Sequence, residues 1–160
     1  MAVWQFALDL IPAAAARVTG IDAIRLSQEQ LEGLSLQLTE ADAADLSARL
    51  AALLPGKPSW NADLRLWGDE KSNDVQIWFD GETVASVQFR LDLSTPSIHL
   101  VDGICAIARR LGCVLVTGDG AVLQPNGEAI VRAALQSSAA RFVDDPDAFL
   151  AEAARLDSQD

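Results

Sequence analysis

The sequence predicts an α+β fold: a single domain over residues 1–160, with an antiparallel or mixed sheet of five to six strands and about four helices packed mainly on one face. Two observations support this class. Strand-like segments with alternating apolar residues follow one another directly between residues 64 and 93, whereas an α/β fold would alternate strands with helices. The chain has 160 residues, 50% of them apolar and 22% charged, which suits a globular domain and excludes intrinsic disorder.

The first predicted strand covers residues 3–10, where the even-numbered side chains are apolar and would face the core. Pro12 ends this strand. Residues 13–38 show no clear period, so a helical turn and an irregular strand both stay open there. A helix begins after Thr39, whose hydroxyl can cap its first turn, and ends before Pro55. Its apolar stripe contains Leu46, Leu50, Leu53 and Leu54.

A meander of three strands is predicted next, over residues 64–67, 75–79 and 83–93. A polar loop joins the first two strands. Asp80-Gly81 is typical of a type I′ hairpin turn between the second strand and the third. On the third strand, alternation predicts that the core-facing side chains are Ala85, Val87, Phe89, Leu91 and Leu93.

The C-terminal half is predicted to contain three more helices and two more strands. The elements are a helix over 97–111 capped by Ser97, a fully apolar strand over 113–117, a short strand over 121–124, a helix over 126–138 capped by Asn126, and a last helix that begins at Asp145-Pro146.

The last helix carries apolar residues on one side, and residues 157–160 after it are expected to fray. The side chains that we expect it to bury are Phe149, Leu150, Ala153 and Leu156.

The chain is strongly acidic, with a net charge of -11 and a pI near 4.3. Without a basic patch it lacks the main driving force for binding nucleic acid or an anionic membrane. No signal peptide is expected, because no basic residue precedes Arg17 and Asp9 interrupts the first apolar stretch. Cys105 and Cys113 are expected to be reduced and buried. We therefore expect a cytoplasmic protein whose partner is neutral or basic.

The most informative side chains lie on the side of the meander that faces away from the predicted core. There Trp67 and Trp78 are expected to share one face with arginines, and the neighbouring loop 68–74 is acidic. Trp and Arg are enriched at protein interfaces because each combines a large contact area with a directed hydrogen-bond donor. The alternative is that helices cover this face too and both tryptophans belong to the core. The predicted partner-binding residues, with Trp and Arg as anchors and the acids as steering and pairing groups, are Trp67, Asp69, Glu70, Asp74, Trp78, Arg90 and Asp92.

No catalytic, cofactor-binding or metal-binding residue is predicted. His99 is the only histidine, and no nucleophile motif accompanies it. Gly118-Asp119-Gly120 has glycines like a phosphate loop but lacks the rest of such a motif, so a turn is the better interpretation. The acidic loop 68–74 does not follow the residue order of an EF-hand. We expect a non-catalytic protein without cofactors.

Four short elements, spread over the whole chain, form a characteristic set. They are the run from Trp4-Gln5-Phe6 to Pro12, Trp67-Gly68 in the first meander strand, Arg90-Leu91-Asp92 near the end of the third, and the segment from Ser138 to Pro146. This set resembles immunity proteins of bacterial polymorphic toxin systems. The resemblance implies a cytoplasmic protein that neutralises one cognate toxin by covering its active site, and it transfers no site residues.

Two other functions are kept as alternatives. An adaptor or chaperone for a secreted effector would share the acidity, and it should dimerise and bind an unstructured segment. A small-molecule-binding domain would use the Trp/Arg face as a pocket, which requires that this face be concave. The chain itself is expected to be a monomer or a homodimer, and its toxin partner is expected to be basic.

Overall fold

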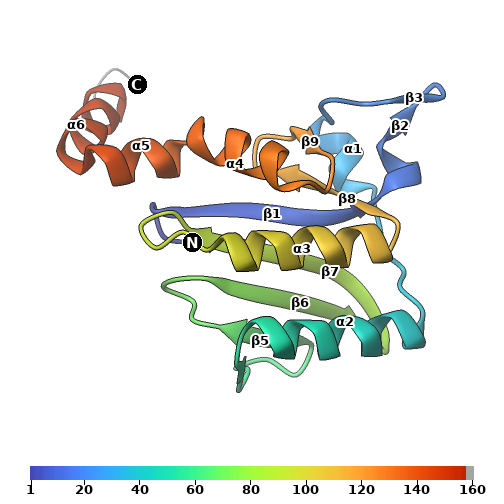
Figure 1. Ribbon diagram of the computed structural model, residues 1–160. Coiled ribbons are helices and arrows are strands. Elements are labelled where there is room, and N and C mark those ends of the chain that lie inside the picture. Colours follow the sequence, from blue (N-terminus) through green and yellow to red (C-terminus); the bar gives the residue numbers. More distant parts are fainter. Residues whose placement is uncertain (158–160) are drawn as a thin grey trace.

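The computed structural model describes residues 1–157 and has an α+β architecture built on a seven-stranded sheet (Figure 1). The strand order is β4-β5-β6-β7-β1-β8-β9, and every neighbouring pair is antiparallel. A two-stranded hairpin, β2 and β3, stands apart from this sheet. The strands are β1 (Gln5–Pro12), β2 (Arg17–Val18), β3 (Ile21–Asp22), β4 (Gly56–Lys57), β5 (Leu64–Gly68), β6 (Asp74–Asp80), β7 (Thr83–Asp92), β8 (Cys113–Thr117) and β9 (Val122–Leu123).

The described residues form six α-helices and one short 3-10 helix. The predicted α+β class is confirmed, but both element counts differ from the prediction. One strand of the large sheet, β4, was not expected, and neither was the short helix over 28–32. The helix predicted over 126–138 ends at Leu135, and Ser137 caps a further helix over 138–144 that was not predicted. The helices are η1 (Ala13–Ala16), α1 (Gln28–Glu32), α2 (Glu40–Leu53), α3 (Ile98–Arg110), α4 (Gly127–Leu135), α5 (Ser138–Asp144) and α6 (Pro146–Asp157).

The main core lies between the sheet and α2 and α3, which run side by side across one face (Figure 1). The even-numbered side chains of β1 from Phe6 onward face this core, as predicted. Gly103 of α3 allows the close approach of the two helices, since a Cβ there would lie 2.6 Å from the methyl groups of Leu53 on α2. The predicted caps hold as well: the hydroxyls of Thr39 and Ser97 accept hydrogen bonds from the third residue beyond each of them.

Residues 13–38, which had no clear period, are divided between two cores: the part up to Leu34 packs in a smaller core on the opposite face, and Leu36 and Leu38 pack in the main core. This segment folds over the end of the sheet, where Leu26 packs near Ile11 of β1 and near Val114 and Val116 of β8. The remaining members of β8 face α3. Both faces of β8 are therefore buried, which is why its sequence is apolar throughout.

The β6–β7 hairpin was predicted correctly. The type of its turn was not, and neither was the side of β7 on which the residues next to the turn lie. Only Gly81 of the two loop residues has a positive φ, +62°, and type I′ requires positive φ at both, so the turn follows the type II′ pattern. A bulge at Trp78/Phe79 then shifts the register, so that Val84 is buried in the main core and Ala85 is not.

The C-terminal helices α4, α5 and α6 follow one another along one end of the molecule (Figure 1). Asp145 caps α6 as predicted, accepting a hydrogen bond from the Ala148 amide at 3.1 Å. The predicted buried side of α6 is wrong: Leu150 and Leu156 are exposed, and only Phe149 is half-buried, against Phe142 of α5. A helix at the end of the fold meets the rest of the chain over too narrow a strip to bury a full stripe. The expected fraying of residues 157–160 falls mainly on 158–160, which lie outside the described residues.

Candidate functional site

The pairing of β5 with β6 places the two predicted anchor tryptophans on opposite faces of the sheet. Trp67 lies opposite Val75 and packs in the main core, where it is 7% exposed. Trp78 lies opposite Leu64 on the other face and is half-buried. Directly paired residues share a face, so the expectation that Trp67 and Trp78 lie together is corrected.

The reason for this misassignment is that Arg65, which is exposed, lies on the same side of β5 as Trp67 and makes that side look outward. Leu64 and Leu66 are buried on the face opposite the helices, so apolar residues occur on both sides of the strand. Trp60, from the segment between β4 and β5, packs edge-to-face on Trp78 with ring centroids 5.9 Å apart. Trp60 is 70% exposed, so this aromatic pair forms an accessible rim of the sheet.

Two of the other predicted residues, Asp74 and Arg90, form a buried ion pair between β6 and β7. They are 2% and 8% exposed and lie directly opposite each other in the strand register. Arg90 donates from Nε to Asp74 Oδ1 at 2.6 Å and from a terminal nitrogen to Oδ2, so the pair is bidentate. The Asp74 carboxylate raises the pKa of Arg90 above its ordinary value. Both charges are thus already neutralised within the chain.

Asp92 holds the turn that follows β7. Its carboxylate accepts hydrogen bonds from the hydroxyls of Ser72, Ser94 and Thr95. Burial alone would raise the pKa of Asp92, but these hydrogen bonds outweigh it and the net effect lowers the pKa. The carboxylate therefore stabilises the ends of two loops as an anion.

The acidic loop between β5 and β6 is fixed to the N-terminal strand. The indole nitrogen of Trp4 donates a hydrogen bond to the Lys71 carbonyl at 2.8 Å. The side-chain nitrogen Nε2 of Gln5 donates to the Glu70 carbonyl at 3.1 Å. Asp69 accepts from the Lys71 amide and stays exposed, while Glu70 is half-buried. Of the seven predicted partner-binding residues, the structure therefore leaves only Asp69, Glu70 and Trp78 accessible. Their role in binding stays a prediction.

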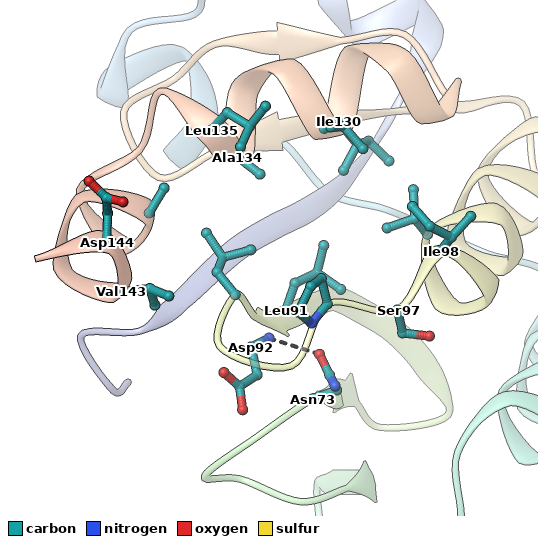
Figure 2. Close-up of a pocket in the computed structure, with 15 residues that line it drawn as sticks. Asn73, Leu91, Asp92, Ser97, Ile98, Ile130, Ala134, Leu135, Val143 and Asp144 are labelled. Atoms are coloured by element: carbon teal, nitrogen blue, oxygen red, sulfur yellow. Dashed lines mark hydrogen bonds between the residues drawn. The ribbon is translucent and has the colours of Figure 1, made fainter.

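An apolar groove that the sequence analysis did not identify lies beside this loop. It has a volume of about 440 Å³ and is bounded by the end of β7, the start of α3, and helices α4 and α5 (Figure 2). Ile98 and Leu135 stand at its rim and are 65% and 72% exposed. The Asp92 amide donates to Asn73 Oδ1 at 2.8 Å on one side, which brings the acidic loop to the groove, and Asp144 lines the other.

The groove is chemically suited to an apolar surface flanked by positive charge. Its lining is mostly aliphatic, and its two ionisable members are both acids, Asp92 and Asp144. A signal for it exists in α4: this helix carries apolar residues at 130 and 134, which are buried, and also at 131 and 135, which are exposed. The apolar side of α4 is therefore wider than its contact with the core requires. Such a surplus of exposed apolar surface indicates a second contact, with a partner or ligand.

The candidate catalytic and metal-binding features stay isolated from one another. His99 is exposed in the first turn of α3, and Gly118-Asp119-Gly120 forms the turn after β8. Burial raises the pKa of the Cys113 thiol to about 11, and it raises that of Cys105 as well. Across residues 1–157, no group of three or more His, Cys, Asp or Glu side chains is placed to hold a metal ion. The same part of the chain contains no helix long and apolar enough to cross a bilayer.

Comparison with known proteins gives no relative from which a function could be transferred. No protein-family model, curated protein or solved structure matches the chain.

Proposed function

We propose that this protein is a non-catalytic immunity protein, which binds a basic cognate toxin of bacterial origin and covers its active site. The observation that carries this proposal is the exposed apolar groove on a chain with a net charge of -11. Contiguous exposed apolar surface on a soluble domain marks a site for a partner. The surrounding acidity favours a basic partner and speeds its association.

The groove and its borders fit an amphipathic, basic segment of the toxin. The aliphatic side chains of Ile98 and Leu135 would contact its apolar side. Asp144 on one wall and the exposed Asp69 in the loop on the other side would lie near its basic residues. The resulting interface would have a desolvated apolar centre and a charged rim, which is the usual composition of a stable protein interface.

The predicted interface is narrowed by this proposal. Trp67, Asp74, Arg90 and Asp92 act indirectly, by fixing β6, β7 and the acidic loop from within. Direct contacts on this side of the molecule come from Asp69 and Glu70. Trp78, paired with Trp60, offers a second contact on the opposite face of the sheet.

A growth assay tests the proposal. The C-terminal domain encoded by a large neighbouring reading frame is expressed in a bacterial host, with or without this protein. We expect the domain to stop growth and the wild-type protein to restore it. Absence of any rescue of a toxic domain contradicts the proposal.

Two variants then locate the interface. Leu135→Asp replaces an apolar contact at the rim of the groove with a negative charge and should weaken binding of the purified toxin domain at least about tenfold. Ile24→Asp is the matched control, because Ile24 is exposed and lies outside the groove. Equal loss in both variants, or in neither, would show that the toxin binds elsewhere.

A small-molecule-binding domain is the second candidate, and the groove volume favours it. A cavity of about 440 Å³ with aliphatic walls lies within the range of sites for small apolar ligands. Nile red, a neutral apolar dye, tests this candidate by fluorescence titration. A saturable signal that Leu135→Asp removes and Ile24→Asp retains would support it, and no saturable signal would exclude it.

A further inference from the structure

A second hollow lies on the face of the sheet opposite α2 and α3. It has a volume of about 290 Å³ and lies between β1, β7, β8 and the segment that follows α1. Its walls include the aliphatic side chains of Ile11, Leu34 and Val116, which belong to the smaller core. The polar side chains at this hollow include Asp9, Glu32 and Ser86.

Asp9, which is half-buried, contributes a carboxylate to the lining of this hollow. Its position on β1 lies opposite Gln88 of β7 on one side and Val116 of β8 on the other. Within residues 1–157, its carboxylate accepts one hydrogen bond, from Gln88 Nε2 at 3.3 Å. Among residues 1–157, no Lys or Arg nitrogen lies within 4 Å of the Asp9 carboxylate, and the lining of the hollow contains no basic residue.

Other acids that are shielded from water in this fold have partners that compensate for their burial. Asp74 has a bidentate arginine, and Asp92 has three hydroxyl donors. Asp9 differs, because burial raises its pKa and the Gln88 hydrogen bond offsets only part of that effect. A carboxylate held in a cavity, with the cost of its burial offset only in part by its hydrogen bond, is typical of a functional site.

We propose that this hollow binds an arginine side chain of a protein partner, with the guanidinium on the Asp9 carboxylate. The aliphatic walls would contact the stem of the arginine, and Glu32 would add a second negative charge at the rim. Arginine fits better than lysine, because a guanidinium can donate two parallel hydrogen bonds to a carboxylate and is less strongly hydrated than an ammonium group. The proposal is independent of the groove, which lies on the other side of the sheet, and of the immunity function.

The test is an NMR titration of the full chain labelled with ¹⁵N. N-acetyl-arginine amide is the probe, and N-acetyl-citrulline amide is its uncharged counterpart of nearly equal shape. We expect saturable shifts at millimolar probe concentration for the amides of Asp9, Glu32 and Ser86, and none with the citrulline compound. Putrescine, a small diamine, is added separately. Stronger binding of putrescine than of the arginine probe would overturn the assignment to an arginine side chain.

Asp9→Asn should weaken binding of the arginine probe at least about tenfold, because it removes the charged acceptor. The variant is expected to fold, since an amide at this position is buried without the cost of a charge, and urea unfolding verifies this. Glu82→Gln is the control, because it removes an equal charge from the exposed β6–β7 turn. Unchanged affinity in Asp9→Asn, or an equal loss in Glu82→Gln, would overturn the proposal.

Discussion

The ion pair between Asp74 and Arg90 should be among the most sensitive points of the fold. Arg90→Met leaves the Asp74 carboxylate, whose side chain is 1% exposed, without a cation. Removing one partner of a buried pair costs about 3–5 kcal/mol, and such full burial places this variant in the upper part of that range. Asp74→Leu should cost less, about 3 kcal/mol, because the Arg90 side chain that remains is 9% exposed and can reach water.

Replacing both partners should restore most of the stability. In Asp74→Leu/Arg90→Met no charge stays buried, so we expect a free energy of unfolding within about 2 kcal/mol of the wild type. The coupling energy between the two sites is then about 5 kcal/mol, since the two single losses sum to about 7 kcal/mol and the double variant loses at most about 2 kcal/mol. Should Arg90→Met fail to fold, recovery of a folded protein in the double variant gives the same comparison.

Urea unfolding followed by tryptophan fluorescence measures these differences. The chain has four tryptophans and no tyrosine, and Trp67 and Trp78 lie on the strands next to the ion pair. Arg132→Met is the control, since Arg132 pairs with Glu128 on the surface and its loss should change stability by less than about 0.5 kcal/mol. If Arg90→Met costs no more than this control, or if the double variant loses the sum of the two single losses, the reasoning is refuted.

Three further predictions follow from burial. Trp67→Ala should lower the free energy of unfolding by about 3–5 kcal/mol, and Trp78→Ala by clearly less, because only Trp67 is in the core; equal losses in urea titrations would contradict the assigned faces. Because the pKa of Asp92 is lowered in the folded state, its carboxylate stabilises the fold at pH values above the unfolded-state pKa of 3.8, and this contribution is lost as the pH falls below 3.8. Asp92→Asn should therefore make the free energy of unfolding depend less steeply on pH in the acid range. An unchanged slope would argue against this role. With a pKa of about 11, the Cys113 thiol should not react with iodoacetamide at pH 8 until the protein is unfolded in urea, and the same holds for Cys105, whose pKa is also raised. Labelling is measured by mass spectrometry. Rapid labelling of the native protein would contradict the burial of both thiols.

The elements that the sequence predicts well are those with a local signal. Strand β1 alternates because one face meets the helices, and the helix that begins after Ser97 has both its cap and its apolar stripe. β8 reads as a buried strand because both of its faces are covered. In each of these elements, propensity, period and capping agree.

The elements that it predicts poorly depend on contacts between distant parts of the chain. In β5 the exposed Arg65 lies on the same side as Trp67, so the local pattern predicts the wrong side for Trp67. The bulge that turns Val84 inward arises from the pairing of β6 with β7, and strict alternation on β7 predicts the opposite orientation. The candidate site is subject to the same limit: the exposed apolar residues of α4 indicate a further contact, but the groove itself forms because α4 packs beside α3 and α5 packs beside α4.

The short outer strands of the sheet limit how any partner can attach. β4 and β9, at the two edges of the seven-stranded sheet, have only two residues each. Adding a foreign strand requires a row of free backbone amides and carbonyls along an edge, and two residues provide almost none. Self-association through edge pairing is discouraged for the same reason. Recognition must therefore use side chains on the faces and at the helix ends of the molecule, so specificity rests on residue identity rather than on backbone pairing.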